Sequence, residues 1–366
     1  MPNTTRNGMS IMKIAVTADV HLTTRGQHPE RYNALASILE RVEELGTSQL
    51  IIAGDLFDHN VQDYSEFEEL CTKHAGVNIH VIPGNHDPGL KASHIVSPNV
   101  RVYSEPTIVD MGMRFLFVPF RTGLTMGEAV APDRDQLESQ AWVLVGHGDY
   151  CGGSRRANPY EPGTYMPLSR SDVERFRPRT VLLGHIHLSI DETPIHYPGS
   201  PCGLDISETG QRRFLIYDTN TGTPTPQTIQ TDVIFFQETF TIVPRADEVD
   251  RLKEEIQRRI EGWSLDDVDL ARAQVRVEAR GFCLDRQAIS DTLASAFRGI
   301  AKYKNASPDV GSLSVSTNGE LEWLASRVEQ LIDEVHLPAA RGSDEPERAE
   351  LIDHALRVIY GEGGVA

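Results

Sequence analysis

Potential metal ligands follow five short apolar runs in the first half of the sequence. The runs read KIAVT, LIIAG, IHVIPG, WVLVG and VLLG, and an aspartate, asparagine or histidine comes soon after each of them. Imidazole nitrogens and carboxylate or amide oxygens bind divalent ions such as Mn, Fe and Zn, and the set contains no thiolate. The candidate ligands are Asp19, His21, Asp55, Asn85, His147, His185 and His187.

This set of ligands is larger than one ion needs, so it predicts two ions. Two ions about 4 Å apart that share a carboxylate can clamp both oxygens of an in-line phosphoryl displacement. The mixed donors suit Mn2+, Fe or Zn better than Mg2+, which prefers oxygen and water. We expect Mn2+, with Fe and Zn as alternatives.

The apolar runs alternate with amphipathic helical stretches up to about residue 237. In PERYNALASILERVEEL, for example, Leu35, Ile38 and Val42 recur at helical spacing behind Pro29. Strands that alternate with helices indicate a layered α/β domain with largely parallel sheets. Ligands collect at the carboxyl ends of such strands, which is where the candidate residues lie.

A single one of these motifs decides little. His185 and His187 would share a face of a strand, where they could bind metal or be two ordinary histidines at a sheet edge. GNHD could equally be a turn closed by an aspartate or asparagine side chain. Four of the five polar positions directly follow a glycine, which predicts tight turns, at Gly54, Gly84, Gly146 and Gly184.

The blocks DVH, GDLFD, GNHD, GH and GHIH, in this order, resemble the five signature blocks of the calcineurin-like metallophosphoesterases. The longer strings ADVHLT, PGNHDPG, LLGHIH and YPGSP are similar to those of the SbcD-type DNA repair nucleases, the nuclease half of the double-strand-break processing complex. The resemblance extends to about residue 205. It implies an α/β fold, a metallophosphoesterase-type layered β-sandwich flanked by helices, with a smaller α+β capping domain and C-terminal helices.

The resemblance also implies how two ions are held. One would be bound by Asp19, His21, Asp55 and His187. The other would be bound by Asp55, Asn85, His147 and His185. Asp55 would then bridge the two ions, and water activated between them would attack phosphorus in line.

His86 follows a ligand in the sequence and has a different role in the family. It stabilises the transition state or protonates the leaving oxygen, a task that suits the pKa of imidazole. Asp87 has two interpretations, because it could orient His86 or close the NHDPG turn.

Four residues are candidates for contact with DNA. Arg121 follows FVPF, Arg155 and Arg156 lie in the loop GHGDYCGGSRRANPY, and His59 lies where some relatives place a DNA-contacting histidine. Such arginines would bind phosphates and position the duplex without reading its sequence. The alternative for each residue is an ordinary solvent-exposed side chain.

The pattern changes after the first domain, which we expect to span residues 1–237. DEVDRLKEEIQRRIEG predicts a helix and AQVRVEARG a strand, so residues 238–318 are expected to form the capping domain, a candidate for DNA contact. The spacing of apolar residues in 319–366 predicts two amphipathic helices. These helices either pack back on the capping domain or dock on a partner. The resemblance implies an SMC-like ATPase of the SbcC type as this partner, and a homodimer.

Composition limits the class of protein. The chain has 366 residues and no apolar run near the roughly 20 residues that span a bilayer, which argues against a membrane protein. The polar start MPNTTRNGMS lacks the features of a secretory signal, so we expect a cytoplasmic protein in which residues 1–11 are a loose tail. The scattered cysteines, Cys71, Cys151, Cys202 and Cys283, predict reduced thiols.

The first hypothesis for function is a metal-dependent DNA nuclease. It would act in DNA repair and recombination as a 3′-to-5′ exonuclease on duplex ends and a single-strand endonuclease. The alternative is a phosphodiesterase or phosphatase that acts on nucleotides or other small phosphoesters, which the net charge of −18 favours because DNA binders are usually basic. A scaffold with a structural metal centre is a third hypothesis, and the full ligand set together with His86 argues against it.

Overall fold

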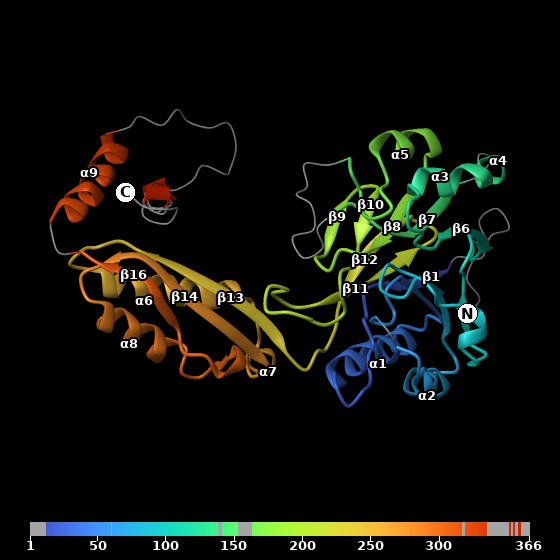
Figure 1. Cartoon of the computed structure of the whole chain (residues 1–366), viewed down its shortest axis with the longest axis horizontal. Coiled ribbons are helices and arrows are strands. Elements are labelled where there is room, and N and C mark those ends of the chain that lie inside the picture. Colours follow the sequence, from blue (N-terminus) through green and yellow to red (C-terminus); the bar gives the residue numbers. More distant parts are fainter. Residues whose placement is uncertain are drawn as a thin grey trace. The chain divides into compact units, whose positions relative to one another are not determined.

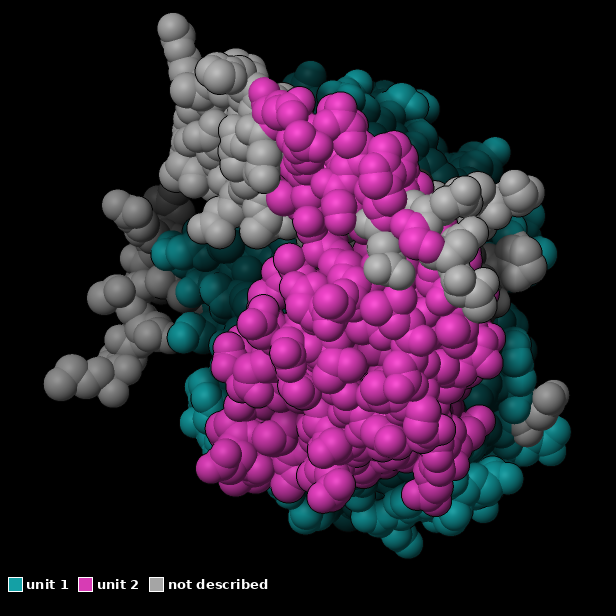
Figure 2. Space-filling view, turned by 90° about the vertical axis from the view of Figure 1, so that its left-hand side faces the viewer, with its two compact units in different colours: residues 1–204, 211–233 teal, residues 205–210, 234–366 magenta. Residues whose placement is uncertain are grey.

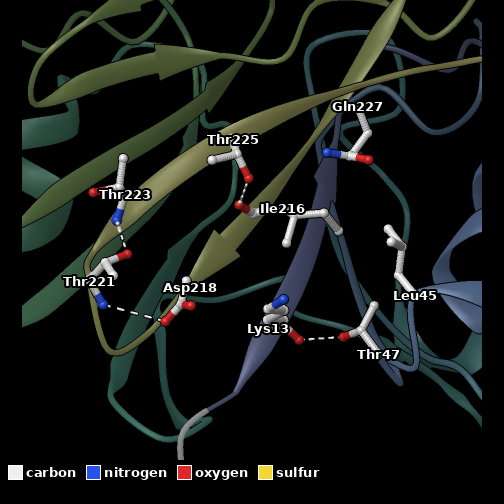
Figure 3. Close-up of a pocket in the computed structure, with 9 residues that line it drawn as sticks. All are labelled: Lys13, Leu45, Thr47, Ile216, Asp218, Thr221, Thr223, Thr225 and Gln227. Atoms are coloured by element: carbon white, nitrogen blue, oxygen red, sulfur yellow. Dashed lines mark hydrogen bonds between the residues drawn. The ribbon is translucent and has the colours of Figure 1, made fainter.

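The chain forms two units in its computed structural model (Figure 2). Unit 1 consists of Met1–Leu204 and Gln211–Val233, and unit 2 consists of Asp205–Gly210 and Ile234–Ala366. The segment Asp205–Gly210 is joined to the rest of unit 2 by a hydrogen bond, which the Gly210 amide donates to the Phe235 carbonyl at 2.9 Å. The structure describes residues 12–59, 61–137, 141–152, 163–316, 319–334, 351–352, 354–355 and 358–359.

Two sheets make up the centre of unit 1 (Figure 1). The first has the strand order β12-β11-β1-β2-β3-β4, in which β1 to β4 run parallel. Its strands are β1 (Lys13–Thr17), β2 (Gln49–Ala53), β3 (Asn78–Ile82), β4 (Val100–Val102), β11 (Arg213–Asp218) and β12 (Thr223–Thr228). The second has the order β5-β6-β7-β8-β10-β9, in which β6, β7, β8 and β10 run parallel. Its strands are β5 (Thr107–Asp110), β6 (Arg114–Val118), β7 (Trp142–His147), β8 (Thr180–Gly184), β9 (Ile190–Glu192) and β10 (Ile195–Tyr197).

Both faces of the central strands are buried, which explains why these strands read as continuous apolar runs. Along β1, Ile14 and Val16 pack against Phe117 and Val145 of the other sheet, whereas Ala15 faces a separate core that includes helix residues. That core contains α1 (Pro29–Glu44) and α2 (Ser65–Lys73). On the other side of the sandwich lie α3 (Met126–Val130), α4 (Arg134–Leu137) and α5 (Arg170–Phe176) (Figure 1). The predicted β-sandwich flanked by helices is confirmed.

Helix α1 illustrates how the sequence sets an element's ends. It begins at Pro29, whose fixed φ suits the first helical turn. Leu35, Ile38 and Val42 are buried on one face, as their spacing predicts. Gly46 follows the helix with φ +66° and bonds back to a helix carbonyl, a conformation that glycine adopts without strain.

Unit 2 is built on a smaller sheet of parallel strand pairs. Strand β14 lies between β13 on one side and β15 and β16 on the other. The elements in chain order are β13 (Ile234–Ile242), α6 (Glu248–Gly262), α7 (Asp267–Leu270), β14 (Ala273–Cys283), α8 (Arg286–Ala296), β15 (Ala301–Lys302) and β16 (Asp309–Val315). Val275, Val277 and Ala279 of β14 pack into one core with residues of α6 and α8, whereas Arg276 between them is exposed. This alternation is as predicted.

Helix α9 (Glu320–Glu334) packs partly on the rest of unit 2. Its residue Ala325 is 1% exposed and forms a cluster with neighbours that include Val243 and Phe282. Trp323 and Leu331 on the same helix remain 66% and 45% exposed. Packing back on the domain was one of two interpretations of this segment, and docking on a partner stays a prediction. Val335 and Leu356 of the predicted amphipathic runs lie outside the described residues.

Cys71, Cys202 and Cys283 are buried, whereas Cys151 is exposed. Within the described part of the chain, no helix is both long enough and apolar enough to cross a membrane.

Candidate metal centre

The candidate ligands meet at the carboxyl ends of five parallel strands that belong to both sheets of unit 1. They lie in the loops after β1, β2, β3 and β8, and one is the last residue of β7. The two sheets are joined here, because His147 Nε2 lies 3.3 Å from Asp55 Oδ2. All seven predicted ligands are described by the structure, namely Asp19, His21, Asp55, Asn85, His147, His185 and His187.

The loops after β1 and β2 remain hydrogen-bonded to each other beyond the ends of the strands. The amide of Asp19 donates to the Gly54 carbonyl at 3.1 Å, and the amide of His21 donates to the Asp55 carbonyl at 3.0 Å. Three of these residues have a left-handed backbone, with φ +55° at Asp19, +50° at His21 and +49° at Asp55. Such conformations cost of order 1 kcal/mol or more each and persist only where the surroundings enforce them, as these bonds do.

One group of ligand atoms is formed by Asp19, His21 and His187, and these atoms lie within 4.8 Å of one another. The Nε2 atoms of the two histidines are 3.1 Å apart. Asp19 Oδ1 accepts a bond from the His185 amide at 2.8 Å, while the buried Oδ2 has no hydrogen-bond partner among the residues that the structure describes. A buried carboxylate oxygen without a partner is costly, and a divalent cation would satisfy it. The donors of this group therefore fit a metal ion.

A second group lies on the other side of Asp55. His147 Nε2 and His185 Nδ1 lie 2.8 and 3.0 Å from Asn85 Oδ1. His147 Nδ1 bonds to the Ala53 carbonyl at 2.9 Å, which leaves Nε2 as the ligand atom. Asp55 Oδ2 is 3.3 Å from this histidine and 3.7 Å from His21 Nε2, so its carboxylate lies between the two groups.

His185 and His187 point to different groups rather than sharing one strand face. Strand β8 ends at Gly184, and His185 has φ +93°, so the alternation of a regular strand stops before the pair. Ile186 between them is 3% exposed and belongs to a hydrophobic core. Both histidines lie beyond the end of the strand, so the rule that positions two apart share a strand face does not apply to them.

The electrostatics of the centre depend on burial. Burial raises the pKa of Asp19 to about 6 and lowers the pKa of His21 to about 3, which keeps this imidazole neutral as metal binding requires. Burial alone would lower the pKa of His147, but the neighbouring Asp55 outweighs it and raises the pKa to about 9. A protonated His147 carries a positive charge. This charge balances part of the negative charge of the carboxylates, which a bound divalent ion would also balance.

His86 lies beside both groups of ligands. Its amide donates to Asp55 Oδ1 at 2.8 Å, its ring meets that of His21 edge-on with centroids 4.5 Å apart, and His59 stacks on it at 3.9 Å. Its Nδ1 is 3.1 Å from Asp58 Oδ1, and this bond lowers the pKa of the Asp58 carboxyl. Asp58 was not singled out from the sequence, although it is the second aspartate of the GDLFD block.

Asp87 makes the contacts of a turn. Its carboxylate accepts from the amides of Gly84 at 2.6 Å and Phe57 at 3.1 Å. Burial, with Asp55 nearby, raises its pKa to about 7. These contacts correspond to the turn-closing interpretation of the NHDPG segment.

A further carboxylate, Asp149, lies next to the second group. Its Oδ2 is 3.7 Å from His185 Nε2 and accepts a bond from the Tyr165 amide at 2.8 Å. A carboxylate near a ligand histidine helps to fix the orientation of the ring. The sequence signal was its position two residues after His147 in the GHGD string.

The glycines before the ligands are required by close packing more than by tight turns. A Cβ atom would lie 2.1 Å from Asp55 Oδ1 if added at Gly84, and 2.1 Å from the Ala53 carbonyl if added at Gly184. Of the four, only Gly54 has a positive φ, +91°, and a Cβ there would also meet His147 at 2.1 Å. Gly146 and Gly184 lie within β7 and β8, so the predicted tight turn is wrong for these two.

The candidates for DNA contact are only partly described. Arg121 forms an ion pair with Glu105, and His59 stacks on His86 as noted above. Arg155 and Arg156 lie outside the described residues. Contact of any of them with DNA stays a prediction.

Comparisons with known proteins give the following similarities. The family described as Calcineurin-like phosphoesterase matches residues 12–189. Exonuclease subunit 1 of Enterobacteria phage T4 is 26% identical over 235 residues, which cover 57% of this chain and 66%, just under two thirds, of that protein. The crystal structure of TT1561 of Thermus thermophilus aligns with a TM-score of 0.42 and 14% identity, over 60% of this chain and 100% of that one. A novel archaeal phosphodiesterase aligns with a TM-score of 0.32 and 17% identity, over 59% and 99%.

Proposed function

The chain contains a calcineurin-like phosphoesterase domain and is a hydrolase acting on phosphoesters, and on this premise we propose that it is a metal-dependent DNA nuclease. The observation that supports the catalytic part most directly is the position of Asp55 between two groups of ligand atoms, with His86 beside them. The similarity to exonuclease subunit 1 of phage T4 supports DNA as the substrate.

In this mechanism two divalent ions, with Mn2+ expected, supply Lewis acidity and offset the charge that builds on the phosphoryl oxygens. The carboxylate of Asp55 and the imidazoles on either side of it would hold the ions. His86 handles the proton: Asp58 accepts from Nδ1, so Nε2 is the atom that can protonate the leaving oxygen. Stacking of His59 restricts the ring of His86. Asp87 supports the turn that carries His86, because its carboxylate accepts a hydrogen bond from the Gly84 amide.

The test uses two substrates in parallel. Protein loaded with Mn2+ is incubated with linear duplex DNA and, separately, with a chromogenic phosphodiester. A duplex labelled at its 5′ ends should yield a ladder of shortened strands, and one labelled at its 3′ ends should release mononucleotide at once, if the polarity is 3′ to 5′. A His86→Leu variant purified in the same way controls for contaminating nuclease. Hydrolysis of the small ester alone would refute the nuclease proposal.

The second candidate is a phosphodiesterase or phosphatase for nucleotides or other small phosphoesters. The net charge of −18 favours it, and so does the ion pair that engages Arg121 with Glu105. The two candidates differ in salt dependence, because binding to a DNA backbone weakens steeply with added salt whereas binding of a small ester does so far less.

We also propose that the chain acts in DNA repair as one subunit of a complex with an SMC-like ATPase and forms a homodimer. Its relative in phage T4 is named as a subunit, which supports an assembly. On α9 the side chain of Trp323 is 66% exposed and suits an apolar partner surface. A Trp323→Ala variant should lose co-purification with the co-expressed ATPase while its hydrolysis of a chromogenic ester is unchanged. Retention of the ATPase at wild-type levels would contradict this assignment of α9.

A further inference from the structure

Arg212 is a buried arginine that bonds to the loop of His187. It is 4% exposed, and its Nη2 atom donates to the main-chain carbonyl of His187. The same guanidinium donates from Nε to the Ser200 carbonyl at 2.9 Å and from Nη2 to Ser200 Oγ at 2.7 Å. The Ser200 amide also donates to the His187 carbonyl, at 3.1 Å. One carbonyl oxygen is therefore fixed by two donors.

Arg31 makes the corresponding contact with His21. It lies in the first turn of α1, is 8% exposed, and donates from Nη1 to the main-chain carbonyl of His21. The same atom is 3.3 Å from Asp58 Oδ2. Each of the two histidines is thus held through its carbonyl by a buried arginine, which lies 10 residues away in the chain for His21 and 25 residues away for His187.

The two histidines held in this way are those whose imidazoles face each other. Their Nε2 atoms are 3.1 Å apart, and they come from positions 166 residues apart in the chain. Buried positive charge near a cation site opposes metal binding, so charge alone gives no reason for two arginines here. Fixing the main chain does give a reason for them, because each hydrogen bond limits the movement of the backbone that carries a candidate ligand.

The YPGSP block, which had no assigned role, lies against the same carbonyl. A Cβ atom at Gly199 would come within 2.7 Å of the His187 oxygen, and the residue has φ +82°. Ser189 Oγ donates to the Pro198 carbonyl at 2.7 Å and joins the block to the segment after His187. Only glycine permits this approach, so the block and Arg212 together fix the position of the loop.

We propose that Arg212 and Arg31 are positioning residues for one of the two metal subsites, the one formed by His21, His187 and Asp19. The inference rests on the proposed dimetal function. We assign both arginines a positioning role rather than a catalytic one, because the contacts observed for them include main-chain carbonyls, Ser200 and Asp58. They set the spacing of two imidazoles before a metal ion binds.

The test is titration of the metal-free full-length protein with Mn2+, followed by calorimetry and by electron paramagnetic resonance of free Mn2+. Arg212→Met removes the donors and the charge but keeps much of the apolar stem. We expect one of the two ions to bind about 10- to 100-fold more weakly and the other to be unchanged within about twofold. Arg212→Lys should show a smaller loss, because it keeps the charge and one donor direction. Ester hydrolysis should recover at saturating Mn2+.

The matched control is Arg213→Met, at the neighbouring position, which is the first residue of β11. This half-buried arginine pairs with Asp191, 2.6 Å away, and makes only a long contact, 3.4 Å, with the Tyr197 carbonyl, so both ions should bind as in the wild type. Arg31→Met should weaken the same ion as Arg212→Met and also lower turnover at saturating metal, because Arg31 contacts Asp58.

Three results would overturn the inference. The first is tighter Mn2+ binding by Arg212→Met, which charge alone predicts, and the second is equal weakening of both ions in that variant. If Arg212→Met does not fold, the third is Mn2+ binding by Arg212→Lys at the wild-type affinity. The titration uses no substrate. A protein that binds two ions but leaves DNA intact would contradict the proposed nuclease and still decide the role of the arginines.

Discussion

The metal centre of unit 1 and the helix-covered sheet of unit 2 are built in opposite ways. The sheet of unit 2 follows from local pattern: in β13 and β14 apolar residues alternate with polar ones, and the helices between them present one apolar face. The metal centre joins residues that are far apart in the chain. His21 and His187, for example, are 166 positions apart and meet through buried polar groups.

This difference shows which region tolerates substitution of its residues and which region does not. Apolar burial in unit 2 depends on area, so a residue of similar size and polarity can replace another at modest cost. At the metal centre each buried polar atom needs a particular partner at a particular distance. We therefore expect substitutions at the centre to change function without much change in stability, and substitutions in unit 2 to do the reverse.

The largest expected effect is on turnover, from His86→Leu. Loss of a general acid costs about 10²- to 10⁴-fold in rate, while the ligands keep their positions. Hydrolysis of a chromogenic phosphodiester measures the rate, and elemental analysis measures bound metal. Loss of metal from this variant would show that His86 is a ligand and that the two functions of the centre are not separable.

The reverse case is Ile256→Ala in α6, which is 2% exposed in the core of unit 2. Truncation of a buried isoleucine should lower the free energy of unfolding by about 2–5 kcal/mol. Metal affinity should be unaffected below the unfolding temperature. Denaturant unfolding with a metal titration on the same sample checks both, and a change in metal affinity would break the contrast between the two regions.

Asp58→Asn tests a partner of His86, the proposed general acid. Asparagine keeps the size of the side chain but not its charge, so His86 should lose its preferred orientation and turnover should fall by about 10- to 100-fold. Asp63→Asn is the control, since this aspartate is exposed and bonds only to Ser65 among the contacts observed. Equal rates in the two variants would mean that Asp58 does not act through His86.

The smallest effects come from a pair of glycine substitutions. Gly184→Ala should destabilise unit 1 by about 1–3 kcal/mol, because the added Cβ would lie 2.1 Å from the Ala53 carbonyl. Gly262→Ala, at the end of α6, meets no atom within 4 Å and should change stability by less than about 1 kcal/mol, toward greater stability. Thermal unfolding of both variants checks the difference, and equal shifts would remove the distinction.

The fold and the ligand-bearing strand ends could be predicted because both depend on local pattern. Polar residues after apolar runs lie at one edge once the strands are parallel, which brings Asp55 and His147 together from different sheets. The partners of the ligands could not be predicted in this way. Arg212 and Arg31 look like ordinary arginines in the sequence, and only their burial against main-chain carbonyls distinguishes them. The role of Asp58 was missed for a similar reason, because its bond to His86 joins loops after two different strands.

The three tryptophans of the chain give each region its own optical signal. Trp142 is 2% exposed in the second sheet of unit 1, and Trp263 stacks on Phe236 within unit 2. Trp323 on α9 is exposed to solvent, so its emission should be red-shifted and quenched by iodide while the other two are protected. Single-tryptophan variants would thus let fluorescence follow the unfolding of each unit, and the covering of α9 by another protein, without any added dye.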